Sequence, residues 1–194
     1  AITPATLSAP VVTLSGSGDW TVTRTGDTAL TFDATAGALT VSGVLNWGDS
    51  GVLTLLSDTM SISDNIAQTA SGSLVIAPHT PATVSIDLAT ALGGLELTSD
   101  EINKIQSGFT SVTFGNSSCA QTLTCAACTT FNSPTVFRSQ DIDITGAVSI
   151  NSGSSSLTCY SGDTAAGSVD VTAVVTATTL TISCGGSGDA VSIT

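Results

Sequence analysis

The sequence predicts an all-β protein and, more narrowly, a right-handed parallel β-helix. Short apolar–polar–apolar triplets recur along the chain, with turn-forming Gly, Ser and Asp between them. Leu53, Leu74 and Leu95 repeat at a step of 21 residues, which accommodates two or three short strands. Such a step is the period of a solenoid coil and is too long for a hairpin ladder.

The triplets supply the expected strands. They begin at residues 21, 30, 39, 53, 60, 74 and 84, and again at 112, 123, 142, 148, 157, 169, 180 and 191. Strand side chains alternate, so the outer residues of a triplet share one face and the middle Thr, Ser or Asp points to the other. We expect inward ladders of Leu, Val and Ile in about eight or nine coils. An antiparallel β-sandwich, which also uses many short strands, is the alternative fold.

One segment, residues 94–115, differs from the others because it contains helical signals. Thr98 can cap a helix with its hydroxyl, and Glu101 can reach back to the amide of the capping residue. Ile102 and Ile105 lie three residues apart, so they share one inward edge. We therefore expect one short helical turn near 99–106, between two strands.

The charge excludes two classes of partner. The net charge is -12, and the bases are Arg24, Lys104 and Arg138. Nucleic-acid binding needs clustered Lys and Arg, and an anionic membrane surface would repel this chain. No apolar run reaches the roughly 18 residues of a membrane span. The scarcity of Lys, the abundance of Ser and Thr, and the cysteines indicate an extracellular or cell-surface protein. Because the sequence lacks an initiator Met and a recognisable signal peptide, we expect a processed product or a piece of a larger protein.

Several segments resemble the repeats of filamentous-haemagglutinin-type exoproteins. They are 20–22 (WTV), 33–41 (DATAGALTV), 46–48 (NWG), 51–55 (GVLTL), 74–78 (LVIAP), 84–86 (VSI) and 94–115. The resemblance covers about residues 11–115, in matching order. It implies a β-helical rod in a secreted adhesin or filament component, without catalytic residues. We therefore divide the chain into coils of the haemagglutinin type (1–115) and continuing coils with cysteine-containing loops (116–194).

The five cysteines all lie in the second part of the chain, at Cys119, Cys125, Cys128, Cys159 and Cys184. In a secreted protein they are disulfide candidates, and Cys159 and Cys184 are expected to stack across neighbouring coils. One cysteine is left over for a free thiol or a link to another chain. The spacing of Cys125 and Cys128 also fits zinc, but too few further ligands are nearby, so we predict no metal site and no cofactor.

Other polar residues have weaker functional interpretations. Asp141 and Asp143 share a strand face and could be a polysaccharide-cleaving pair, although a solvated outer face explains them as well. The turn at 185–189 departs from a calcium-binding repeat, and His79 lies in a proline-bounded turn without a nucleophile. Asn116 begins a glycosylation sequon.

Threonine pairs raise the possibility of ice binding. They occur at Thr21/Thr23, Thr122/Thr124 and Thr179/Thr181. An ice-binding face needs such pairs in register at every coil, and the sequence does not show that recurrence, so exposed β-propensity is the simpler explanation.

The sequence thus favours a non-enzymatic structural segment of an extracellular filament, sheath or adhesin. Its expected partners are identical subunits or flanking repeats, which would associate through the ends of the coil stack. A carbohydrate-binding or carbohydrate-cleaving β-helix that contacts surface glycans is the second hypothesis, and ice binding is the third.

Overall fold

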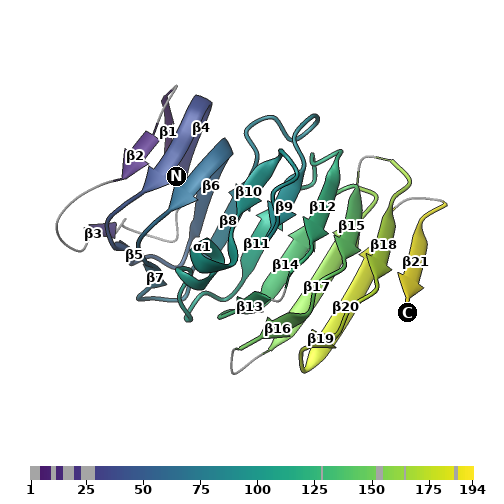
Figure 1. The fold of residues 1–194 in the computed structure, drawn as a ribbon. Helices are drawn as coiled ribbons and strands as arrows, with labels where there is room; N and C mark the ends of the chain where they lie inside the picture. Colours follow the sequence, from purple (N-terminus) through teal and green to yellow (C-terminus); the bar gives the residue numbers. More distant parts are fainter. Residues whose placement is uncertain are drawn as a thin grey trace.

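The computed structural model describes residues 5–9, 12–14, 20–22, 29–127, 129–151, 155–163, 165–185 and 188–194. These residues form a parallel β-solenoid of about 7 turns, in which successive coils stack along one axis (Figure 1). Every strand pairing among them is parallel. The predicted fold class is confirmed, and the antiparallel sandwich is excluded.

The first sheet is the longest and runs the length of the solenoid. In spatial order it contains β1 (Ala5–Ala9), β4 (Leu30–Val41), β6 (Val52–Ile62), β8 (Ser73–Ala77), β11 (Val112–Gly115), β14 (Thr135–Arg138), β17 (Ser156–Ser161) and β20 (Thr179–Cys184), with β2 (Val12–Leu14) paired to the second half of β4. β4 pairs with β6 over nearly its whole length, with a register shift between Ala34 and Ala38. Because β11 pairs with β14, the first sheet runs without a break across the predicted boundary at residue 115.

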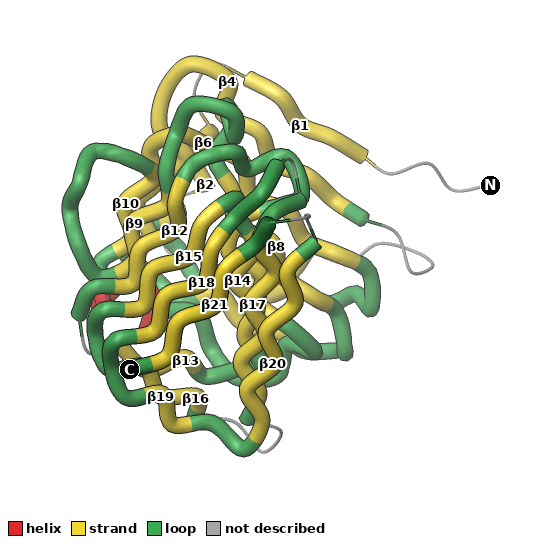
Figure 2. The backbone as a smooth tube through the Cα atoms, turned by 90° about the vertical axis from the view of Figure 1, so that its right-hand side faces the viewer, coloured by secondary structure: helices red, strands yellow, loops and turns green. Residues whose placement is uncertain are grey.

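Two further sides complete each coil. The second sheet contains β10 (Leu95–Leu97), β9 (Ile86–Leu88), β12 (Thr122–Cys125), β15 (Asp141–Ile144), β18 (Ser168–Val171) and β21 (Ala190–Ile193). The third side consists of two three-stranded sheets, β3 (Trp20–Val22), β5 (Leu45–Trp47) and β7 (Ile66–Gln68), and then β13 (Thr129–Phe131), β16 (Val148–Ile150) and β19 (Val175–Thr176). Figure 2, which faces the C-terminal end, shows the strands of successive coils stacked behind one another.

The core is a set of ladders that run along the inside of the solenoid. On the first sheet, the alternation that the triplets predict puts Leu53, Leu74 and Leu157 inward, each fully buried. The neighbouring inward position includes Phe114 and Phe137, which pack edge to face with each other at a centroid separation of 6.2 Å and with Phe131 of β13 at 5.5 and 5.6 Å. No coil could bury this apolar surface alone, so the stacking of neighbours stabilises each coil.

The predicted step is correct for two of its three residues. Leu53 pairs with Leu74, but Leu95 lies in the second sheet, and the residue that follows Leu74 on the ladder is Val112. Between Leu74 and Val112 the chain also forms β9, β10 and α1 (Ser99–Asn103), so that nearly two coil lengths of sequence supply one rung. This insertion explains why there are about 7 turns instead of eight or nine.

The helix forms for the local reasons that the sequence indicates. The Thr98 hydroxyl accepts a hydrogen bond from the amide of Glu101, and the Glu101 carboxylate accepts one from the amide of Thr98. Ile102 is buried beneath the helix, and Ile105 forms an isolated parallel bridge to Ile66. α1 also contacts β13, so it occupies the third side where β7 gives way to β13.

Candidate functional site

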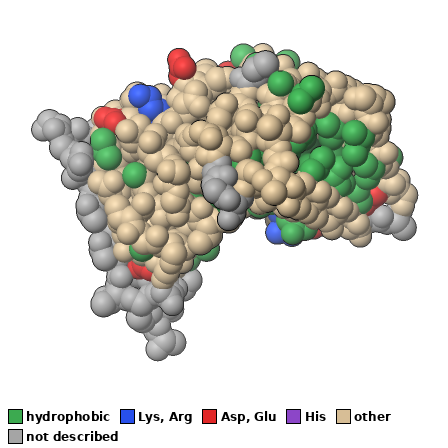
Figure 3. Space-filling view, turned by 90° about the horizontal axis from the view of Figure 1, so that it is seen from below, with side chains coloured by type: hydrophobic (Ala, Val, Ile, Leu, Met, Phe, Trp, Pro, Cys, Tyr) green, Lys and Arg blue, Asp and Glu red, His purple; other side chains and the backbone are tan. Residues whose placement is uncertain are grey.

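The last coil is the place where apolar side chains reach the surface. β19, β20 and β21 each stand at the end of their sheet, so in the described part of the chain one edge of each strand is unpaired. Leu180 is 38 % exposed, Val191 52 % and Ile193 62 %, whereas Leu74, an equivalent inward residue of an inner coil, is fully buried. Figure 3 shows hydrophobic side chains gathered at this end. The last coil is built like the inner coils and lacks only a neighbour on one side.

The N-terminal end of the stack also has strands with one unpaired edge. β1, β2 and β3 pair with β4 and β5 on one side, and the described residues place no strand on their other side. Leu7 of β1 is 51 % exposed. Among the described residues, both ends therefore present unpaired strand edges, from all three sides at the last coil and from the first and third sides at this end, because the second sheet begins at β10.

A column of acidic and hydroxyl side chains runs along the outer face of the second sheet. In register, it consists of Glu96, Asp87, Thr124, Asp143, Asp170 and Ser192. Burial raises the pKa of Asp143, and the neighbouring carboxylates of Asp170 and Asp141 raise it further. Asp141 has a structural role, because its Oδ1 accepts hydrogen bonds from the amide (2.9 Å) and hydroxyl (2.8 Å) of Ser168.

Of the carboxylate pair considered for glycan cleavage, Asp143 is part of this column, whereas Asp141 is in register with Thr122 and Ser168. Asp141 and Asp143 do share the outer face of β15, as the triplet pattern predicts. Trp47 is fully buried, and its indole N–H donates to the carbonyl of Gly51 at 3.1 Å, so its ring cannot stack on a sugar. Within the described ranges, no three His, Cys, Asp or Glu side chains come together as a metal site.

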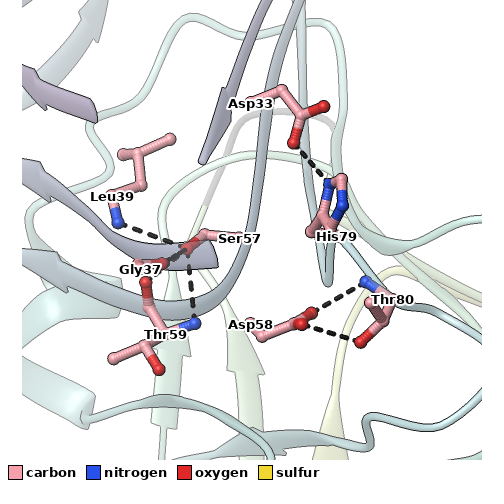
Figure 4. A network of polar contacts seen from close by, with 8 residues as sticks. All are labelled: Asp33, Gly37, Leu39, Ser57, Asp58, Thr59, His79 and Thr80. Atoms are coloured by element: carbon pink, nitrogen blue, oxygen red, sulfur yellow. Dashed lines mark hydrogen bonds and ion pairs between the residues drawn. The ribbon is translucent and has the colours of Figure 1, made fainter. Parts of the chain in front are cut away.

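His79 and Thr80 fasten the loop after β8 to the two long strands. The Nδ1 atom of His79 lies 2.6 Å from Oδ1 of Asp33 in β4, and Asp58 of β6 accepts from the amide and hydroxyl of Thr80 (Figure 4). Nearby, the buried Ser57 accepts from the amide of Leu39 at 3.2 Å, close to the register shift of β4. His79 is thus a structural contact that ties its turn to β4.

The cysteine predictions need correction. Cys119, Cys125, Cys159 and Cys184 are free thiols in the structure, and Cys128 lies outside the described residues. The expected stacking of Cys159 on Cys184 is not found, because the register pairs Cys159 with Ile182.

Three of these thiols, Cys119, Cys125 and Cys159, are buried in the core, and the last two lie within strands. Cys125 lies between Leu88 and Ile144 in the second sheet, and Cys159 follows Phe137 in the first. Both are fully buried, and burial raises the pKa of each thiol to about 12. A thiol in such a position behaves as a small apolar side chain, which the sequence spacing alone could not reveal.

Cys119 and the predicted sequon meet in one turn after β11. The amide of Asn116 donates to Sγ of Cys119 at 3.3 Å, and Oδ1 of Asn116 accepts from the amide of Ser118 at 2.8 Å. Ser118 is exposed and Asn116 is half-buried. The candidate glycosylation residue therefore lies in a surface turn.

Comparisons with protein-family models, curated proteins and solved structures found no match. The one helix in the described ranges is five residues long, and it is not long and apolar enough to span a membrane. The open ends and the outer columns of the solenoid are therefore the features that bear on function.

Proposed function

We propose that this chain is a non-enzymatic structural segment of an extracellular filament, sheath or adhesin, and that it extends by adding coils at its ends. The observation that supports the proposal is the last coil, where β19, β20 and β21 have unpaired edges beside exposed Leu180, Val191 and Ile193. Unpaired strand edges next to apolar side chains are templates for further parallel pairing. The added strands come from a second copy of the chain or from flanking coils of the same protein.

The physical reason is the free energy of burial. Fully burying a Leu, Val or Ile side chain stabilises by about 1.5–3 kcal/mol, and several such side chains lie on the last coil. A head-to-tail contact between the last coil and the first is heterologous, so it extends into a filament when it does not close into a ring. The resemblance of residues 11–115 to filamentous-haemagglutinin-type repeats favours the same role and a surface location.

The experiment measures association with a matched pair of variants. Light scattering and electron microscopy of the purified chain should show elongated particles whose length increases with protein concentration. Leu180→Lys with Val191→Lys places two charges on the last coil and should leave a monomer. Leu92→Lys changes an apolar residue that is 66 % exposed in the loop between β9 and β10, and it should associate like the wild type.

Two results would count against the proposal. A wild-type chain that stays monomeric at its highest soluble concentration would leave the ends without the proposed role. Equal association of the Leu180→Lys/Val191→Lys variant and the Leu92→Lys control would place the contact elsewhere on the surface.

A further inference from the structure

The middle outward position of the first sheet is a column of threonine and valine. Its members, in register from β1 to β20, are Thr6, Thr31, Thr54, Val75, Thr113, Val136, Thr158 and Thr181. These two side chains are nearly isosteric, and each presents a methyl group on a stiff, β-branched stem. All eight strands of the sheet's main path therefore carry the same shape at the same position.

A second column runs beside the first, at the position two residues earlier in the chain, which lies inside or just before each strand. From β4 to β20 its members are Ala29, Val52, Ser73, Ser111, Pro134, Ser156 and Thr179. The register pairs Val52 with Ser73 and Ser156 with Thr179, and Oγ of Ser111 lies 3.2 Å from Oγ of Ser73. Each coil thus presents a pair of small or β-branched side chains without charge.

Charge is excluded from both columns. The chain contains 15 Asp and Glu, yet none of them stands in either column, whereas the outer face of the second sheet carries several. The nearest charges on the first sheet are Asp33 and Arg138, which occupy the next outward position along their strands. Arg138 is turned to Asp163 at 2.7 Å and to the ring of Tyr160.

The threonine hydroxyls of the middle column are available to solvent. Among the described residues, Thr31, Thr54, Thr113, Thr158 and Thr181 make no side-chain hydrogen bond. By contrast, Ser73 of the second column is hydrogen-bonded to Thr110 at 2.8 Å. The column therefore offers a line of threonine hydroxyls together with the methyl groups of threonine and valine, held in place by the buried core beneath it.

We propose that this face of the first sheet binds ice. Parallel strands place equivalent side chains about 4.8 Å apart between coils, and residues i and i+2 lie about 6.6 Å apart along a strand. The two columns thus form a grid of uncharged side chains, in which the threonine hydroxyls of the middle column are unpaired while Ser73 and Ser111 of the second column bond to each other. Both spacings are close to the repeats of water oxygens on prism faces of ordinary ice. A repeating, uncharged surface fits a repeating ligand, whereas charged side chains would hold their own hydration shells in place.

The threonine pairs singled out in the sequence did not identify this surface. Thr122 and Thr124 lie on the second sheet, and Thr23 lies outside the described residues. Only Thr179 and Thr181 belong to the grid. The residues that recur in register are one threonine or valine in each strand of the first sheet. The pattern becomes visible only when the residues inserted between β8 and β11 are left out of the alignment of coils.

The test is thermal hysteresis, together with partition of the protein into a growing ice hemisphere. The wild-type chain should lower the freezing point below the melting point and enter the ice, unlike albumin at equal mass. Thr113→Lys with Thr158→Lys should lose both properties. Thr130→Lys, on the outward face of β13, is the matched control and should keep both. Thr113→Val should also keep both, because the column already contains valine.

Three outcomes overturn the proposal. They are absence of hysteresis in a folded wild-type chain, undiminished hysteresis in Thr113→Lys/Thr158→Lys, and an oligomer that these lysines dissociate in a chain without hysteresis, which would make the face an interface between copies. Circular dichroism verifies that each variant is folded. The test does not rest on coil addition, because hysteresis can be measured in the Leu180→Lys/Val191→Lys background.

Discussion

Asp143 shows how parallel stacking changes the chemistry of a single surface residue. Its register partners are Thr124 on one side and Asp170 on the other, so a carboxylate that would be ordinary on a loop has another carboxylate one rung away. Burial contributes most to the raised pKa of Asp143, and the charges of Asp170 and Asp141 contribute the rest. Repulsion along the column therefore opposes folding whenever these groups are ionised.

We expect Asp143→Asn to stabilise the protein at neutral pH. Because the folded pKa of Asp143 is raised, the folded state holds its proton more tightly than the unfolded chain. The ionised side chain thus disfavours the folded state above the folded pKa, and this effect fades as the pH falls towards the unfolded value of about 3.9. Thermal unfolding should show a higher Tm for Asp143→Asn than for wild type at pH 7, and a smaller difference near pH 4.

A double-mutant cycle provides the control for this prediction. In an Asp170→Asn background the gain from Asp143→Asn at pH 7 should shrink, because one of the repelling charges is gone. A gain in Tm that is the same at pH 7 and near pH 4 would contradict the assignment to ionisation.

Cysteines mark the limit of sequence reasoning at this scale. The spacing of Cys159 and Cys184 by about one coil suggested a bridge, but a shift of two residues in register places Ile182 and not Cys184 beside Cys159. The triplet pattern did contain the useful signal, since Cys125 and Cys159 each end an apolar–Thr–Cys triplet and so stand at inward positions. The cysteine content favoured disulfides, whereas the alternation of inward and outward side chains favoured core positions. Alternation is the constraint that each strand imposes on its own residues.

At the scale of elements, α1 was predictable because its signals are contiguous. Thr98 and Glu101 form the capping box from residues three apart, without any help from distant coils. The structure adds a tertiary contact that no local pattern contains, since Oε1 of Glu101 also accepts from the amide of Ile62 at 3.0 Å. One carboxylate therefore caps the helix and satisfies the end of β6.

Glu101→Ala should destabilise the protein by about 1–3 kcal/mol. The substitution removes the reciprocal cap and leaves the amide of Ile62 without its acceptor, and an unsatisfied, partly buried donor costs about that much. Asp100→Ala, an exposed acidic residue in the same first turn, is the matched control and should cost about 1 kcal/mol or less. Urea unfolding measures both, and equal losses in the two variants would show that Glu101 acts only through its charge.

The order of strands in the second sheet could not be predicted from the sequence. β10 follows β9 in the chain, but it lies on the opposite side of β9 from β12, so residues 89–94 carry the chain back to start a second parallel strand. Ala89, with a positive φ of 57°, begins this return, and Oδ2 of Asp87 accepts from the amides of Leu92 and Gly94. Residues 89–94 gave no sign of the direction in which the chain returns, so Leu95 resembled the next rung of the ladder.

The molecule as a whole is a one-dimensional stack, so its stability should vary along its axis. An inner coil has a neighbour on both sides, whereas the last coil has one, and its inward residues remain exposed. In such arrays the free energy of local opening is roughly a sum of coil and interface contributions. The middle of the stack, around the Phe114, Phe131 and Phe137 cluster, should therefore be the last part to open.

Hydrogen exchange followed by mass spectrometry should reveal this gradient in the unassociated protein. We expect the amides of β11 and β14 to exchange slowest, and those of β20 and β21 to exchange fastest among the strands of the first and second sheets. Under conditions that favour association, protection should rise in the last coil. Uniform protection from β11 to β21 in a monomer would show that the chain opens as one cooperative unit.

The insertion-free half of the chain has an evolutionary consequence. Val112 and Thr135 occupy the same place in successive turns, so a tandem duplication of residues 112–134 in the gene would thread one more turn without disturbing those above or below. Point changes must fit their surroundings, but copying a whole turn brings the surroundings with it. Lineages that carry this sequence can thus lengthen the protein in single genetic steps, and related genes should differ in whole turns more often than in fractions of one.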